Sequence, residues 1–252
     1  MKRKIVSKLK LLSTVVLVLL SLSYAQAKTA LTLGVVLFPP DVTIDEKTKE
    51  CVGSAITTTR ELLLEYGIKL HVVCAPAQRI IRMLQSKEID FTISVKSDEI
   101  LTKHVVYSDI PFRKVKINLY VRNELKQFKT ISAVRGFEYQ GYRKKYSEEG
   151  MEFIDLPNSV SAIQFFLKGR SEAMISYEAP VQSYMKTNQI VMQDTYTITV
   201  LQEANLYYSV AKQSPHFNEL LHAFRDYAVK HQAQHYISAQ QQKNNREETT
   251  EF

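Results

Sequence analysis

Two basic side chains near the middle of the chain have the chemistry to hold an anionic group. Arg79 stands at the start of a predicted helix, where free N–H groups and a partial positive charge attract anions. Lys96 comes directly after a predicted buried strand. Both residues would lie at the edge of an α/β sheet where ligands bind. The alternative for Arg79, as for Arg82, is a surface charge on an exposed helix face.

The other candidate binding residues carry hydroxyl groups or aromatic rings. Serine hydroxyls can donate or accept hydrogen bonds to a ligand, but at these loop positions they can equally cap helices. Aromatic rings supply a large contact area at little entropic cost, although each alone is more often a core residue. The candidates are Ser94, Ser97 and Ser159 among the serines, and Phe38, Phe137, Tyr139 and Tyr177 among the aromatic residues.

The chain has no motif that predicts catalysis. It lacks a glycine-rich phosphate loop, a Gly-x-Ser-x-Gly turn and a His-Glu-x-x-His zinc helix. Glu138 and Glu178 could form a carboxylate pair for acid–base chemistry. His231 and His235 have the i, i+4 spacing of zinc ligands, with a solvated helix end as the alternative. We therefore expect binding without catalysis, and neither a metal nor a cofactor.

The first 27 residues have the pattern of a secretory signal peptide. A basic segment, residues 1–10, precedes an apolar stretch, residues 11–24, which ends in Ala25-Gln26-Ala27. We expect cleavage before Lys28 and a periplasmic location. An uncleaved anchor is the alternative, but the apolar stretch is shorter than the roughly 20 residues that span a bilayer.

Composition and charge argue against a nucleic-acid partner. The net charge of the whole chain is +7, but five basic residues and no acidic one precede Lys28, which leaves +2 on the mature chain. No later segment has a block of like charges that could follow a phosphate backbone. The 45% hydrophobic and 23% charged residues are ordinary for a globular chain with one large or two small domains.

Cys51 and Cys74 are the two cysteines of the chain. An even number of cysteines in an exported protein favours a disulfide, and both lie in loops expected at the same edge of the sheet. Such a bridge would fix the rim of a cleft. A pair of buried thiols is the alternative, and a metal site is disfavoured because no histidine lies near either cysteine at ligand spacing.

The apolar patterns predict an α/β fold with two lobes of similar architecture. In each lobe, strands and helices alternate, so right-handed crossovers give a mostly parallel sheet flanked by helices. The predicted strands are 31–37, 69–73, 89–94, 114–121, 130–134, 151–155, 172–176 and 206–211. The predicted helices are 54–66, 77–86, 139–148, 160–167, 179–186 and 217–231.

The lobes are expected to be formed by interleaved parts of the chain. Lobe 1 is predicted to comprise residues 28–113 and 205–239, because the strand from 206 crosses back and the last helix docks there. Lobe 2, with the crossing strands, is predicted to comprise residues 114–204. Residues 240–252 have almost no apolar side chains and are predicted to be disordered.

Six short motifs follow one another in an order typical of one protein family. They are Phe38-Pro39-Pro40, Gly53 before a helix, Pro76 with Arg79, Lys87-Glu88-Ile89-Asp90 before a strand, Tyr107-Ser108-Asp109-Ile110-Pro111-Phe112, and Gly136. On these motifs the chain resembles the family 3 extracellular solute-binding proteins, which serve polar amino-acid ABC transporters in the periplasm. The resemblance covers residues 31–238.

The resemblance implies a two-lobed periplasmic-binding-protein-like fold of type II, in which two crossing strands join lobes that close over a small-molecule ligand. It also implies a monomer that delivers its solute to an ABC permease. A membrane signalling receptor is the alternative partner, and an enzyme on the same fold is a third possibility.

Two positions depart from the pattern of this family. Members that bind α-amino acids usually place an arginine for the carboxylate where this chain has Leu101, and an aspartate for the ammonium where it has Tyr177. Glu178, which lies next to Tyr177 in the chain, is a further candidate binding residue. We therefore expect a small polar or anionic solute in the cleft between the lobes, and not a plain α-amino acid.

Overall fold

The computed structural model describes residues 30–96, 99–190 and 195–238. The predicted signal peptide, the predicted disordered tail and Ser97 lie outside these ranges. Within them, no helix combines the length and the apolar character that a membrane span requires.

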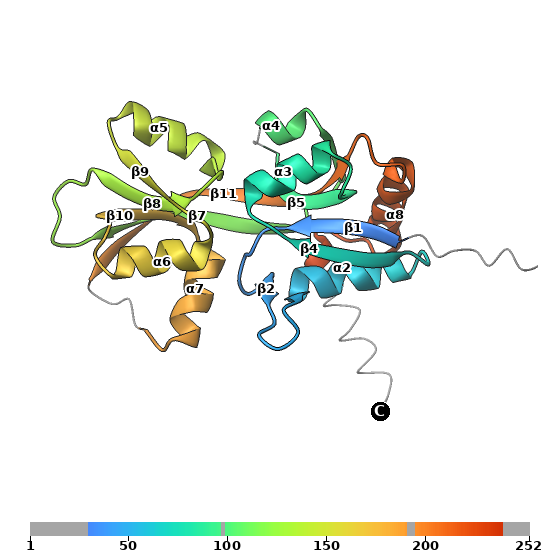
Figure 1. The fold of residues 1–252 in the computed structure, drawn as a ribbon, viewed down its shortest axis with the longest axis horizontal. Coiled ribbons are helices and arrows are strands. Elements are labelled where there is room, and N and C mark those ends of the chain that lie inside the picture. Colours follow the sequence, from blue (N-terminus) through green and yellow to red (C-terminus); the bar gives the residue numbers. More distant parts are fainter. Residues whose placement is uncertain (1–29, 97–98, 191–194, 239–252) are drawn as a thin grey trace, which may run out of the picture.

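The structure is a mixed α/β fold with two lobes that two long strands join (Figure 1). These crossing strands are β7, Arg113–Arg122, and β11, Tyr196–Ala211, and they pair with each other in antiparallel orientation. The sheet has the strand order β4-β1-β5-β11-β7-β10-β8-β9, and β6 also pairs with β11. The crossing pair therefore lies at the centre of one continuous sheet, and the predicted fold class is confirmed.

Lobe 1 is built on the parallel strands β1 (Ala30–Val35), β4 (Lys69–Cys74) and β5 (Phe91–Val95). Its helices are α2 (Ser54–Leu64), α3 (Ala77–Gln85), α4 (Glu99–Thr102) and α8 (Phe217–Lys230). Its shorter strands are β2 (Thr43–Ile44), β3 (Cys51–Val52) and β6 (Val105–Tyr107). The apolar run of β1 is buried on both faces, as expected of a parallel strand covered by helices. Gly34 has no side chain on the face where Ile80 of α3 packs, and a Cβ there would lie 3.0 Å from Cδ1 of Ile80.

Lobe 2 is built on the parallel strands β8, Thr130–Val134, β9, Glu152–Leu156, and β10, Ala173–Tyr177. Its helices are the 3₁₀-helix η1 (Tyr139–Gly141), α5 (Tyr142–Glu148), α6 (Ser159–Leu167) and α7 (Glu178–Thr187). The side chain of Asn158 caps α6 by accepting a hydrogen bond from the backbone N–H of Ser161.

Two elements differ from the sequence prediction. The strand predicted at 206–211 begins ten residues earlier, at Tyr196. Its first part, Tyr-Thr-Ile-Thr-Val, alternates apolar and polar residues as a strand does, but the prediction did not use this signal, and the residues from Thr197 to Val200 are exposed. The single helix predicted at 139–148 is divided, because Gln140 and Gly141 both have positive φ angles. The predicted lobe boundaries remain predictions, since β7 and β11 run through both halves of the sheet.

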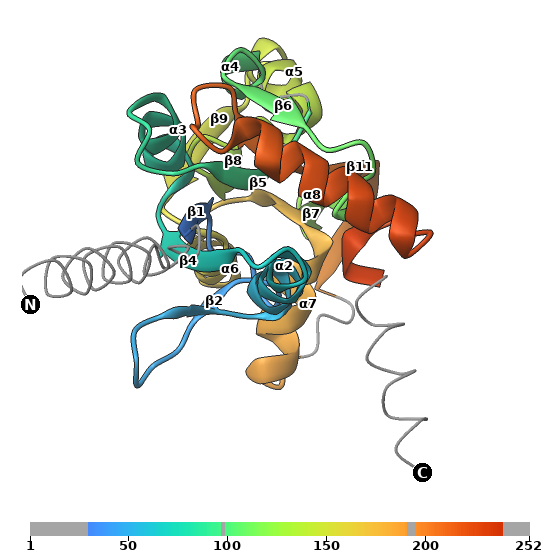
Figure 2. The same cartoon turned by 90° about the vertical axis from the view of Figure 1, so that its right-hand side faces the viewer.

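The last helix, α8, lies against lobe 1 (Figure 2), and an aromatic cluster holds it there. The ring of Phe224 in α8 stacks on the ring of Tyr208 in β11, with centroids 4.2 Å apart. Phe91 and Tyr236 complete the cluster. The hydroxyl of Tyr208 lies 2.9 Å from Oγ1 of Thr59 in α2, so the buried ring also has a polar partner.

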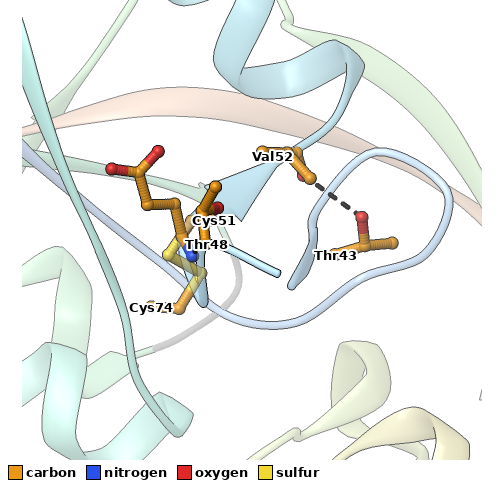
Figure 3. The surroundings of a disulfide bond; sticks show 6 residues. Thr43, Thr48, Cys51, Val52 and Cys74 are labelled. Atoms are coloured by element: carbon orange, nitrogen blue, oxygen red, sulfur yellow. Dashed lines mark hydrogen bonds between the residues drawn. A yellow bond between two sulfur atoms is a disulfide. The ribbon is translucent and has the colours of Figure 1, made fainter. Parts of the chain in front are cut away.

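The predicted disulfide between Cys51 and Cys74 is present, with the two Cα atoms 6.0 Å apart. It joins β3 of the small β2–β3 hairpin to the carboxyl end of β4, as Figure 3 shows. The hydroxyl of Thr43 donates a hydrogen bond to the carbonyl of Val52 across the same hairpin. The hairpin is therefore tied to the sheet edge at which β4 ends.

A double Cys51→Ser, Cys74→Ser variant is expected to unfold with a free energy lower by about 3 kcal/mol. The bridge closes a loop between residues 23 positions apart, and its loss frees the unfolded chain. Urea unfolding with and without a thiol reductant measures the effect. Reductant should destabilise the natural chain by the same amount and leave the double variant unchanged; equal stability of both proteins without reductant would contradict the prediction.

Candidate functional site

A cavity of about 120 Å³ lies between the two lobes. Lobe 1 contributes the ends of β1 and β5, including Val35 and Val95, and the first turns of α3. Lobe 2 contributes the segment from Gly136 to Tyr139 after β8, and Tyr177 at the end of β10. The cavity thus lies at the carboxyl ends of the parallel strands, where open α/β sheets bind ligands.

Five of the nine predicted binding residues that the structure describes line this cavity. The five are Phe38, Ser94, Phe137, Tyr139 and Tyr177. They come from both lobes, so the structure brings together side chains that lie far apart in the sequence. Ser94 is already hydrogen-bonded, because its Oγ lies 2.6 Å from Oγ of Ser209.

The other four predicted residues lie elsewhere. Arg79 is exposed on α3, whereas its neighbours Ile80 and Ile81 line the cavity. Nζ of Lys96 lies 3.8 Å from the ring centroid of Tyr207, in a separate groove along the crossing strands. The remaining two, Ser159 and Glu178, are in the first turns of α6 and α7; the first is buried and the second lies 3.8 Å from Lys116.

Sequence reasoning missed Asp41 and most of the apolar lining. Leu101, which stands where family members carry a carboxylate-binding arginine, is buried in the cavity wall. Asp41 could have been found from the sequence, because it comes directly after the Phe38-Pro39-Pro40 turn that carries Phe38. Glu138 lines the cavity as well, but Glu178 does not, so the structure does not form the carboxylate pair considered for acid–base chemistry.

Asp41 anchors the loop that carries Phe38 into the cavity. Its carboxylate pairs with the guanidinium of Arg113, which begins β7, and also accepts a hydrogen bond of 2.8 Å from Oγ of Ser54. The carbonyl of Asp41 accepts a hydrogen bond from the backbone N–H of Ala55. The negative charge of Asp41 is therefore neutralised within the protein.

Aromatic rings from both lobes meet at the cavity. The ring centroid of Tyr177 lies 5.3 Å from that of Phe38, 5.8 Å from that of Phe137 and 5.7 Å from that of Tyr139. Burial raises the pKa of the Tyr177 and Tyr139 hydroxyls above the ordinary value, so both are neutral at physiological pH. The Tyr139 hydroxyl accepts a hydrogen bond from the N–H of Val134, whereas that of Tyr177 has no partner among the described residues.

The lobes touch beside the cavity at Gly136. This residue has a φ of +81°, and a Cβ on it would lie 3.2 Å from Cγ of Gln78 and 3.6 Å from Cβ of Ala77. The start of α3 in lobe 1 thus packs on the backbone of lobe 2. The lobes are therefore in contact at Gly136, and a side chain there would disturb this contact.

Replacing Gly136 with valine is therefore expected to favour an open arrangement of the lobes. Gly150→Val is the matched control, because Gly150 has a φ of +85° but nothing within 4 Å of its Cβ position. Both variants should lose about 1–2 kcal/mol of stability from left-handed backbone strain. In small-angle X-ray scattering, only Gly136→Val should show a larger radius of gyration; equal radii for the two variants would contradict the prediction.

No family model matches the chain, and no curated protein matches it. Solved structures do match. An ancestral arginine-binding protein bound to arginine is 21% identical, with 84% of this chain and 97% of that chain covered and a TM-score of 0.68. The chain has the two-lobed fold of the periplasmic solute-binding proteins.

Two further structures with the solute-binding fold are similar. The substrate binding protein of an amino acid ABC transporter is 19% identical, with 83% of this chain and 96% of that chain covered and a TM-score of 0.66. The GluR0 ligand-binding core from Nostoc punctiforme, in complex with (L)-glutamate, is 16% identical over the same shares of each chain, with a TM-score of 0.63. The fold predicted from the resemblance is thus confirmed.

Proposed function

We propose that this chain binds a small solute between its lobes and delivers it to an ABC-type transporter. The observation that carries the proposal is the cavity, which side chains of both lobes line. A solute there contacts both lobes only when they are closed, so its differential affinity stabilises the closed form. A permease would then distinguish the loaded protein from the empty one by the position of its lobes.

The names of the similar structures support a binding role and not a catalytic one. One is the substrate binding protein of an amino acid ABC transporter, and another was solved with arginine bound. We accordingly propose a periplasmic, monomeric binding protein with an ABC permease as its partner.

The character of the solute is part of the proposal. A ligand other than a plain α-amino acid is supported by Leu101 and Tyr177, which line the cavity where family members place charged anchors. The polar or anionic character of the solute was predicted from Arg79 and Lys96. Neither side chain lines the cavity, so the cavity lining gives this prediction no support, and it stays a prediction.

A thermal-shift screen of the purified mature protein tests the proposal. Amino acids, amines, organic acids and short peptides are added singly, and native mass spectrometry detects any solute carried through purification. A ligand at 100 times its Kd adds about 2.7 kcal/mol to the stability of the folded form. The shift should be lost in Phe38→Ala, which removes a ring from the cavity wall. Shifts of equal size in that variant would place the binding site elsewhere, and no shift with any class would refute solute binding.

A further inference from the structure

The size of the cavity limits the body of the solute. A dry cavity of about 150 Å³ lined by leucine, isoleucine and phenylalanine side chains admits one benzene ring. The inter-lobe cavity measures about 120 Å³, somewhat less than this, so the apolar part of the solute is limited to at most one ring or a short hydrocarbon chain.

The walls of the cavity favour an apolar body. Lobe 1 contributes Ile80, Ile81, Leu101 and the ring of Phe38, and lobe 2 contributes the ring of Tyr177. A polar group pressed against Ile80, Ile81 or Leu101 would lose its water without gaining a hydrogen bond. Aromatic and aliphatic groups instead gain contact area there.

The charges of the lining favour a cation. Among the described residues that line the cavity, none is lysine, arginine or histidine, and two are carboxylates. Arg113 neutralises one of them, Asp41. The other, Glu138, is exposed and has no ion-pair partner in the described part of the chain. A bound anion would therefore lie near an unbalanced carboxylate without a counter-charge.

An ammonium group would find three kinds of partner in the same place. Glu138 supplies a carboxylate, the free hydroxyl of Tyr177 can accept an N–H bond, and the rings of Phe38 and Tyr177 can attract a cation by their negative faces. The exposed carboxylate would hold the charged end toward solvent while the apolar end occupies the cavity.

We propose that the solute is a small monoamine, with one aromatic ring or a short hydrocarbon chain and a single ammonium group. The inference rests on the proposed function, because it specifies the solute class for the same cavity. It differs from the sequence prediction in the sign of the charge and in the apolar body.

Three probes of nearly equal size test the sign of the charge. Phenethylamine carries a positive charge at neutral pH, phenethyl alcohol carries none, and phenylacetate carries a negative charge. Isothermal titration of the natural protein should give the lowest Kd for the amine and the highest for the acid. The separation between amine and acid should be on the order of tenfold, because one charge gains a partner and the other is repelled.

Glu138→Gln tests the residue that is responsible for the preference. The variant should raise the Kd for phenethylamine by about two- to fivefold, as an exposed ion pair allows, and should leave binding of phenethyl alcohol unchanged. Glu149→Gln is the matched control, because Glu149 is also an exposed acidic residue of lobe 2 but does not line the cavity. It should not change either Kd.

The outcomes separate this inference from the proposed function. Phenylacetate binding as tightly as phenethylamine, or equal effects of Glu138→Gln and Glu149→Gln, would overturn the amine assignment. If none of the three probes binds but another class gives a shift that Phe38→Ala abolishes, the amine assignment fails and solute binding stands. If no class binds, both fail.

Discussion

Replacing Arg113 with methionine is expected to lower the free energy of unfolding by about 3 kcal/mol. The guanidinium of Arg113 is the cationic partner of Asp41, whose side chain is only 7% exposed. Methionine keeps the apolar length of the side chain but leaves the carboxylate buried with the hydroxyl of Ser54 as its remaining side-chain partner. The loss lies at the lower end for a broken buried pair, since Arg113 itself is 26% exposed.

Urea unfolding followed by circular dichroism measures this loss. Arg79→Met is the control, because Arg79 is exposed and has no ion pair within the described ranges, so its replacement should cost less than about 0.5 kcal/mol. Adding Asp41→Asn to Arg113→Met should restore part of the stability, since no charge then remains buried. If the Arg113 and Arg79 variants were equally stable, the ion pair would not anchor the Phe38 loop.

Phe224→Ala is expected to cost about 4 kcal/mol of unfolding free energy. The ring is 1% exposed and stacks on Tyr208, so its removal leaves a cavity between α8 and the sheet. Phe91 and Tyr236, which lie 5.6 and 6.0 Å from it between ring centroids, lose a partner as well. The variant should therefore loosen α8 from lobe 1 before the rest of the molecule unfolds.

Val229→Ala in the same helix is the control, because Val229 is 72% exposed. Chemical denaturation should show almost no change for this variant. The chain has no tryptophan but 14 tyrosines, so near-ultraviolet circular dichroism reports on aromatic packing as a whole, and the difference between the two variants reports on the packing around Phe224. Similar stabilities of the two variants would show that the aromatic cluster does not hold α8.

The repeating strand–helix pattern made the fold predictable, because buried parallel strands are continuous apolar runs. The lobe 1 strand β1 is close to this kind, whereas β5 alternates apolar residues with Thr92 and Ser94 and is fully buried only at its first two residues. The first half of β11 is not a continuous apolar run and was missed, although its alternating Tyr-Thr-Ile-Thr-Val segment is a signal that could have found it. The break at Gln140 was also hidden, because a non-glycine residue with positive φ carries little sequence signal.

The aromatic part of the cavity was predictable for a different reason. Phe137 follows β8 closely and Tyr177 is the last residue of β10, so the chain direction places both at the carboxyl edge of the sheet. The position of Arg79 relative to the cavity was harder to predict, because the rotation of α3 about its axis decides which of its side chains face the cavity. Packing turns Ile80 and Ile81 toward the cavity and leaves Arg79 exposed. Whether the predicted residues bind a solute remains a prediction.

The position of β11 in the sheet also determines the order in which the molecule can be completed during synthesis. The hydrogen bond between Oγ of Ser94 and Oγ of Ser209 joins residues 115 positions apart, whereas β8, β9 and β10 are formed within one uninterrupted stretch. During synthesis from the N-terminus, β8, β9 and β10 can pair with one another before β11, the neighbour of β5, has been made. The lobe that begins the chain is therefore expected to be the last to fold.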